Sequence, residues 1–346
     1  MSLDTDPRVA DLSATLMISA DSHVVEDPAL WDGVLPEGHW GELTGSFSRK
    51  GAYDAQARVP EMAVDGVSAE VLYPSLAMKL FALEPDVQAE CFRRYNEWIA
   101  QFCAVDPDRL LGVGLIPVYD IDRALDEVRW CDEHGLRGVQ IWQTPHPDLP
   151  FTGRHYDAFW SECAARGLPV SLHAITGFDH SQKLFGDMSK GDVSSSIEFF
   201  RINNHCLFAV MDTLLDLIFS GALDRHPDLR VVLVENEAAW LPFALDTWDY
   251  FYEKFSDDKE IGLGRAPSEC FADHVFATFL MDGNVSHVAR QIGASNLMWS
   301  NDYPHGMSTW PNSRQIVGER LADLDEPERA ALLHGNVARL YGIDLP

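Results

Sequence analysis

Short apolar runs recur along the chain, and each one ends in polar residues and is followed by a segment with helical spacing. The runs are almost continuously apolar instead of alternating, which is typical of parallel strands that are covered on both faces. Eight such strands are predicted, at residues 16–23, 69–75, 110–118, 138–143, 169–174, 230–237, 276–282 and 296–302.

Amphipathic helical segments lie between these strands. Strand and helix alternate along the whole chain, so an α/β fold of the (β/α)8 TIM-barrel type is predicted. An open doubly wound sheet is the alternative, but the glycine-rich phosphate turn that usually follows its first strand is missing. Helices are predicted at residues 86–104, 120–134, 155–166, 199–219, 284–291 and 326–341.

Two connections are longer than the usual loops of a barrel. Residues 24–60 follow the first strand, and residues 175–198 follow the fifth. Both leave the carboxyl ends of strands, where barrel enzymes carry their active sites, so we expect these insertions to cover the site. Packing against helices or neighbouring subunits is the other interpretation. The predicted organisation is a tail over 1–15 and a single distorted barrel domain over 16–346.

The charge balance excludes several classes of partner. Of the 346 residues, 54 are acidic and 26 are basic, which gives a net charge of −28. Nucleic acids and anionic membranes require a basic face, so neither is expected as a partner. The N-terminal segment lacks the apolar core of a secretory signal, and the six cysteines form no CxxC pair. A protein of the cytoplasm, where thiols stay reduced, is therefore expected.

Polar side chains end several of the predicted strands. Asp21 and His23 end the first strand and, being two residues apart, point the same way. The ends of the fifth, sixth and eighth strands supply His173, Glu235 with Glu237 on the same face, and Asp302 followed by His305. In a barrel these ends meet at one mouth, and converging imidazoles and carboxylates suit a metal site.

Further candidates lie near the same mouth. His180 and His205 lie in or after the insertion that follows the fifth strand, and either can reach the mouth as an acid, a base or a substrate donor. Trp142 lies near the end of the fourth strand and is a candidate for contact with the substrate. The chain has no GxSxG nucleophile motif.

Five segments together resemble a known family: DSHVVEDPALW at 21–31, SLHAITG at 171–177, SGALDRHPDLRVVLVENEAAWLP at 220–242, WSNDYPH at 299–305 and LHGNVARLYGI at 333–343. They are similar to the amidohydrolase-related branch of the amidohydrolase superfamily. This branch includes aminocarboxymuconate-semialdehyde decarboxylase and the resorcylate-type decarboxylases. The resemblance extends from about residue 16 to residue 343.

The resemblance implies a distorted (β/α)8 barrel with one divalent metal, commonly zinc or manganese. The positions that match the family's metal ligands are Asp21, His23, His173 and Asp302. The resemblance also implies that Asp302 acts as acid and base. The sixth strand departs from the family pattern, because decarboxylases typically carry His-Gly there and this chain carries Glu235-Asn236-Glu237.

The expected function is that of a metal-dependent enzyme, first a non-oxidative decarboxylase of an unsaturated or aromatic carboxylic acid. A metal-dependent hydrolase of an amide, lactone or ester is the alternative, which the missing sixth-strand histidine favours. A barrel that has lost its chemistry and acts only as a binding protein is the third hypothesis. In either enzyme Asp302 would move a proton, while Glu235 or His305 would supply a second acid/base group or orient a ligand.

The expected cofactor is one divalent ion, with zinc first and manganese or iron as alternatives. The expected partner is a small-molecule substrate. The resemblance also implies a homodimer, to which the apolar helix predicted at 199–219 can contribute.

Overall fold

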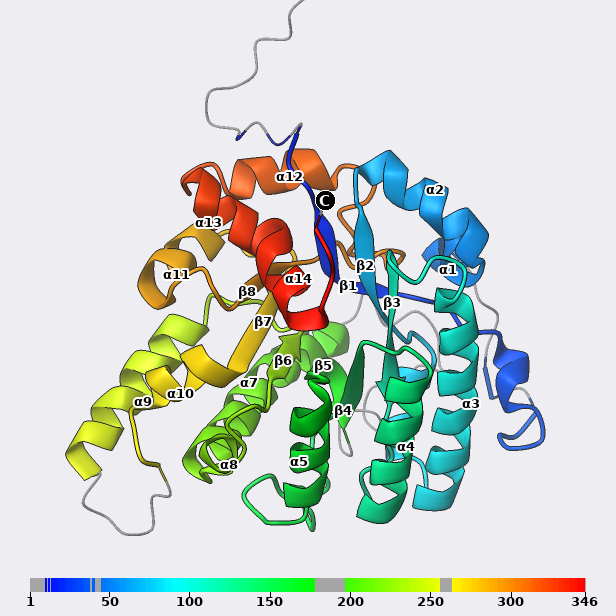
Figure 1. Cartoon of the computed structure of the whole chain (residues 1–346), viewed down its shortest axis with the longest axis horizontal. Helices are drawn as coiled ribbons and strands as arrows, with labels where there is room; N and C mark the ends of the chain where they lie inside the picture. Colours follow the sequence, from blue (N-terminus) through cyan, green and yellow to red (C-terminus); the bar gives the residue numbers. More distant parts are fainter. Residues whose placement is uncertain are drawn as a thin grey trace, which may run out of the picture.

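The structure is a computed structural model that describes residues 10, 12, 14–37, 39–40, 45–177, 197–255 and 263–345. Eight parallel strands pair in chain order, and the helices lie outside them (Figure 1). This arrangement confirms the predicted (β/α)8 barrel. The strands are β1 (Ile18–His23), β2 (Ala69–Tyr73), β3 (Leu110–Leu115), β4 (Gly138–Thr144), β5 (Val170–Gly177), β6 (Val231–Val234), β7 (Val275–Phe279) and β8 (Leu297–Trp299).

Each predicted helix is present, and several others accompany them. The structure has α1 (Lys50–Tyr53), α2 (Ala55–Asp65), α3 (Pro85–Cys103), α4 (Ile121–Glu133), α5 (Asp157–Arg166), α7 (Ile197–Phe219), α8 (Ala222–Arg225), α9 (Leu241–Phe255), α10 (Pro267–His274), α11 (Val285–Ile292), α12 (Ser313–Arg320), α13 (Glu326–Ala330) and α14 (Asn336–Tyr341). Among the described residues, no helix combines the length and apolar character needed to cross a membrane.

The insertion after the first strand is more structured than expected. The segment 24–60 contains the 3-10 helices η1 (Pro28–Trp31) and η2 (Gly45–Ser48), then α1 and the first half of α2. Phe47 of η2 meets the ring of His305 edge-on, with the ring centroids 5.5 Å apart. This insertion therefore reaches the barrel mouth, as predicted. Most of the insertion after the fifth strand, residues 178–196, lies outside the described residues.

A mainly apolar cluster fills the barrel interior below its mouth. Inward-facing residues such as Val71, Val113 and Val232 form one buried cluster, which also contains Tyr341 of α14. The barrel closes between β1 and the segment after β8: the His23 N–H donates to the Tyr303 carbonyl (2.6 Å), and the Asp302 N–H donates to the Asp21 carbonyl (3.0 Å). This closure brings residues from the two ends of the sequence together at the mouth.

A buried arginine braces this closure. Arg58 of α2 is fully buried, and its Nε donates to Glu70 Oε2 of β2 (2.6 Å). Its Nη1 donates to the His23 carbonyl (2.7 Å), and its guanidinium lies 4.3 Å from the centroid of the Tyr303 ring. Arg58 therefore holds the ends of β1 and of the segment after β8 at once.

Replacing Arg58 by alanine is expected to lower the free energy of unfolding by about 3–5 kcal/mol, because Glu70 would keep a buried charge without its partner. Urea unfolding followed by circular dichroism measures the loss. The double variant R58M/E70L removes both charges and is expected to lose less than R58A. A loss below about 1 kcal/mol for R58A, the value of an exposed pair, would contradict the bracing role.

Candidate metal centre

A β-bulge aims the first two candidate ligands into the barrel. The register of β1 against β2 shifts between Ser19 and Ser22, so the inward face changes by one residue. Ala20 and Asp21 both lie in the shifted segment: Ala20 packs in the barrel interior, whereas Asp21 and His23 face the metal cluster. The Ser19 hydroxyl donates to the Asp21 carbonyl (2.8 Å) and so supports the bulge.

Four side chains from three strand ends converge at the mouth. His23 Nε2 lies 3.4 Å from Asp21 Oδ1 and 3.4 Å from Asp302 Oδ1, and His173 Nε2 lies 3.6 Å from Asp21 Oδ1. Four ligands at about 2.0–2.1 Å from a tetrahedral ion would lie about 3.3 Å from one another. The separations within the triad of Asp21, His23 and His173 fit one small divalent ion, and Asp302 lies beside the same His23 nitrogen.

The two histidines are held with their Nε2 atoms toward this point. His23 Nδ1 lies 2.8 Å from the Pro74 carbonyl, and His173 Nδ1 lies 2.9 Å from the Ala174 carbonyl. Because a carbonyl oxygen only accepts hydrogen bonds, each Nδ1 carries the hydrogen and each Nε2 offers a lone pair. A second hydrogen bond of this kind usually orients a metal-bound histidine.

The converging atoms lack hydrogen-bond partners although they are buried. Among the described residues, this holds for Nε2 of His23 and His173 and for both carboxylate oxygens of Asp21 and Asp302. An unpaired buried polar atom costs about 1–3 kcal/mol, so a cluster of such atoms needs a ligand. A divalent cation held by Asp21, His23 and His173, with Asp302 beside it, would satisfy these atoms, so the residues present fit the metal that the sequence predicts.

The charges at the centre are unbalanced without a cation. Burial, with the charges of Asp302 and Asp21, raises the pKa of Glu235 to about 8, and burial also raises the pKa of Asp302 to about 7. Burial works against the charge of His173, but the carboxylates of Asp21 and Glu235 outweigh it and raise its pKa to about 9. A divalent ion would offset the repulsion between these carboxylates.

Strained backbone surrounds the mouth. Among the described residues, the non-glycine residues with positive φ are Ile175 (72°), Glu235 (58°), Glu237 (51°) and Asp302 (52°). Each lies at the end of β5 or shortly after β6 or β8. The left-handed conformation costs an L-residue about 1–2 kcal/mol, and strain of this kind clusters at functional sites.

The sixth strand ends earlier than predicted. β6 stops at Val234, and Glu235 lies in the turn with its Oε2 3.7 Å from His173 Nδ1. Glu237 was predicted to share a face with Glu235, and this was wrong. The Glu237 carboxylate instead accepts hydrogen bonds from the N–H groups of Leu280 and Met281 (3.2 and 3.0 Å). The positive φ angles of both glutamates end the strand alternation on which that prediction relied.

The structure places the remaining candidates at different distances from the mouth. His305 Nδ1 lies 2.8 Å from Asp302 Oδ1, and its ring stacks on His23 with centroids 3.9 Å apart. Trp142 is fully buried, and its indole N–H donates to the Tyr156 hydroxyl (3.1 Å). His205 is exposed on α7. His180 lies outside the described residues.

Sequence reasoning missed two side chains near these ligands. Ser75, directly after β2, has its Oγ 3.0 Å from His305 Nε2. Its position at a strand end is the signal that could have revealed it. The guanidinium of Arg49 lies 4.7 Å from the centroid of the Trp310 ring, and its Nη1 is buried without a hydrogen-bond partner. Nothing in the sequence around Arg49 singles it out.

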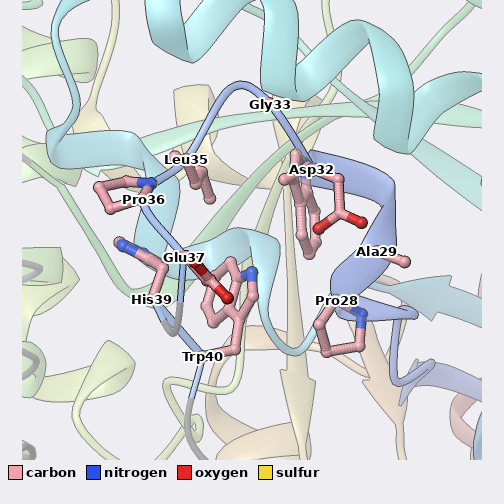
Figure 2. Close-up of a pocket in the computed structure, with 10 residues that line it drawn as sticks. Pro28, Ala29, Asp32, Gly33, Leu35, Pro36, Glu37, His39 and Trp40 are labelled. Atoms are coloured by element: carbon pink, nitrogen blue, oxygen red, sulfur yellow. The ribbon is translucent and has the colours of Figure 1, made fainter.

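A separate cavity of about 560 Å³ lies within the loop that follows β1. Figure 2 shows residues from Pro28 to Glu37, with His39 and Trp40, curling around it. The rings of Trp31 and Trp40 lie with their centroids 5.0 Å apart. Its lining contains none of the four converging side chains. The cavity is therefore distinct from the metal centre.

Residues 31–343 match the family model described as amidohydrolase, which spans most of the chain. The chain belongs to the amidohydrolase family. This membership agrees with the resemblance that the sequence motifs indicate, and with the location of the polar cluster at the carboxyl ends of the strands.

Curated relatives and solved structures are similar over nearly the full length of this amidohydrolase. A gamma-resorcylate decarboxylase from Rhizobium sp. (strain MTP-10005) is 24% identical over 94% of this chain and 98% of its own. The 2-amino-3-carboxymuconate-6-semialdehyde decarboxylase of Dictyostelium discoideum is 22% identical over 87% of this chain and 81% of its own length. A third relative is the structure of a dihydroxybenzoic acid decarboxylase from Polaromonas sp. JS666, which holds manganese and the inhibitor 2-nitroresorcinol. It is 20% identical, has a TM-score of 0.73, and the match covers 96% of this chain and 98% of that one. The TM-score shows that the Polaromonas structure and this chain share the same fold.

Proposed function

We propose that this amidohydrolase is a metal-dependent non-oxidative decarboxylase of an aromatic or unsaturated carboxylic acid. The observation that carries the proposal is the buried triad of Asp21, His23 and His173, together with Asp302, which shares His23 with this triad; the facing atoms of all four lack hydrogen-bond partners. The decarboxylase activities named for its relatives support the choice of reaction.

The proposed ligands are Asp21, His23, His173 and Asp302. A divalent metal held there would supply a Lewis acid that stabilises negative charge on a substrate oxygen as carbon dioxide leaves. Asp302 is the proposed proton donor to the ring or chain carbon that loses the carboxylate. Its backbone is tied to β1 through the hydrogen bond to the Asp21 carbonyl, which restricts where its carboxyl group can lie.

An acidic substrate also needs a cation outside the metal, because the net charge of −28 repels anions. Arg49 is the proposed group: it lies over the rings of Trp310 and of Tyr303, the residue that follows Asp302. Its Nη1 has no hydrogen-bond partner in the structure and remains available to a carboxylate.

Zinc is the proposed metal. The donor separations of 3.4, 3.4 and 3.6 Å are close to the roughly 3.3 Å edge of a tetrahedral zinc site. Manganese, which the Polaromonas relative holds, is the other candidate. Metal analysis of protein purified without chelators distinguishes the two.

The test of the reaction is the release of carbon dioxide. The metal-loaded protein is incubated with hydroxylated benzoic acids and carboxyvanillic acid, and with labelled bicarbonate plus the decarboxylated phenols. We expect one carbon dioxide per product and incorporation of label into the acid, both lost after chelation. Esters, amides and lactones are assayed in parallel, because Glu235 in place of the sixth-strand histidine favours a hydrolase. Hydrolysis without carbon dioxide release or exchange would overturn the decarboxylase.

A homodimer is the proposed assembly. Apolar side chains on α7 are unusually exposed, including Ile197 (67%) and Phe208 (59%). Large exposed apolar residues on one helix commonly mark a protein interface. The cytoplasm remains the proposed location, which the six free, buried cysteines support.

A further inference from the structure

Helix α9 presents an aromatic face to solvent. It lies at the edge of the molecule, with α10 beside it on the side of the strands (Figure 1). The inner side of α9 packs into the protein through Ala244, Leu245 and Trp248, which are buried. Its outer side exposes four aromatic side chains: Phe243 (70%), Tyr250 (57%), Phe251 (49%) and Phe255 (61%). A set of large apolar side chains exposed on one helix marks an interaction surface.

The four exposed rings form one stripe along the helix. Phe243 and Tyr250 are seven residues apart, which is close to two full turns, so they lie on the same side. Phe251 and Phe255 are four residues apart and lie beside this row. The rings of Tyr250 and Phe251 have their centroids 6.0 Å apart, which joins the two rows. The stripe therefore extends over most of the length of α9.

The area of the stripe is large enough to form the centre of a stable interface. An aromatic side chain buries about 150–250 Å² when it is fully covered. Four rings that are 49–70% exposed therefore offer roughly 450 Å² of mostly apolar surface. A standard interface buries about 800 Å² on each partner, with an aromatic centre and a polar rim. The stripe alone would supply about half of that area.

Two opposite charges flank the stripe at equal distances from Tyr250. Asp246 lies four residues before Tyr250 and Lys254 four residues after it, and both side chains are exposed. The Lys254 ammonium lies 5.5 Å from the centroid of the Tyr250 ring, so the charge and the ring share one side of the helix. Within the described part of the chain, neither charge takes part in an ion pair. The stripe is consequently complementary to itself when it is turned end to end.

We propose that α9 packs antiparallel against α9 of a second copy of this chain, about a two-fold axis at Tyr250. The inference specifies the interface of the proposed homodimer and rests on that assembly. Residues at equal distances from the axis face each other across such an interface. Each Lys254 then meets Asp246 of the other copy, and the two Tyr250 rings meet at the axis.

The symmetric spacing of the charges favours a second copy over an unrelated protein. A two-fold interface uses the same surface on both partners, so the surface must match itself. The net charge of −28 opposes the approach of two identical chains. Two ion pairs between Asp246 and Lys254 would relieve this repulsion at the point of contact, and they would fix the antiparallel direction of the helices.

Exchange of the two charges tests the pairing. D246K alone places lysine against lysine, and K254D alone places aspartate against aspartate. Each single variant should raise the dissociation constant of the dimer at least about tenfold, because like charges would face each other twice. The double variant D246K/K254D restores opposite charges and should return the constant to within about threefold of the unaltered value. Analytical ultracentrifugation at low salt measures these constants, since salt screens exposed charges.

A cysteine at the axis gives an independent test. All six native cysteines are buried, so a cysteine introduced at the surface is the accessible thiol. Y250C should form a disulfide-linked dimer on mild oxidation, because the two copies of residue 250 would lie next to each other. V64C is the matched control: Val64 is 66% exposed on α2, which lies on the other side of the molecule from α9 in Figure 1. V64C should remain unlinked.

The outcomes separate this interface from the other proposals. A dimer that neither single exchange weakens, a double variant that binds no better than the single ones, or equal linking of Y250C and V64C would overturn the pairing of α9 and leave α7 as the dimer surface. An unaltered protein that stays monomeric would overturn the homodimer as well. No measurement involves substrate, so a failure to release carbon dioxide would overturn the decarboxylase alone.

Discussion

Replacing His173 by alanine is expected to remove the metal from this amidohydrolase. His173 Nε2 has no hydrogen-bond partner, and its Nδ1 is already committed to the Ala174 carbonyl. Loss of one imidazole leaves three ligands, so bound metal should fall below about a tenth of an ion per chain. Turnover should drop at least about 1,000-fold, since the metal stabilises the transition state by several kcal/mol. Elemental analysis and carbon dioxide release measure the two effects.

His274 provides the matched control for this variant. It is also buried, and its Nδ1 also lies close to a backbone carbonyl, that of Leu229 (2.9 Å). Its Nε2, however, lies 2.9 Å from Arg265 Nη2 and faces no metal cluster. H274A should lose stability and retain metal. If H173A keeps its metal at the level of H274A, the proposed centre is misplaced.

The barrel and its mouth were predictable because they follow from local patterns. A buried parallel strand needs a continuous apolar run, and the first polar residue after each run lies at the barrel mouth. This reasoning identified Asp21, His23 and His173, which lie within hydrogen-bonding or metal-binding reach of one another. The i, i+2 rule placed Asp21 and His23 on one face correctly, although the register shift between Ser19 and Ser22 includes Asp21.

The same rule failed where the backbone leaves the strand. Glu235 and Glu237 are also two residues apart, but both adopt positive φ, so their side chains diverge. A sequence does not reveal left-handed glutamates, because tertiary contacts hold them there. Helices α2 and α9 were not predicted: α2 carries Pro60 in its interior, where proline is normally unfavourable, and α9 exposes aromatic residues such as Phe243 (70%) on its polar side.

The contacts between distant loops were the least predictable part of the centre. Ser75, Glu26 and His305 come from three separate loops, and their arrangement depends on how the turn after β2 packs. No spacing rule links such positions. The role of Arg58 could not be predicted for the same reason, because it depends on the barrel closure that joins residues 23 and 303.

Replacing Asp302 by asparagine is expected to separate metal binding from proton transfer. Asparagine has the same shape, and its amide oxygen can still act as a ligand, whereas it has no proton to deliver to carbon. We expect kcat to fall about 100- to 10,000-fold, the range attributed to a positioned acid or base. The metal content at saturating zinc should remain at more than about half of that in the unaltered enzyme, because Asp21, His23 and His173 remain.

Asp282 tests whether the effect is specific to Asp302. It is a buried aspartate shortly after β7, and its carboxylate accepts hydrogen bonds from the N–H groups of Ala238 (3.1 Å) and Asn284 (2.8 Å). D282N should be less stable and should turn over at nearly the unaltered rate. A zinc-loaded D302N that decarboxylates as fast as D282N would exclude Asp302 as the proton donor. The proton would then have to come from another group at the mouth, and Glu235, with Oε2 buried and unpaired 3.7 Å from His173, is the one to replace next.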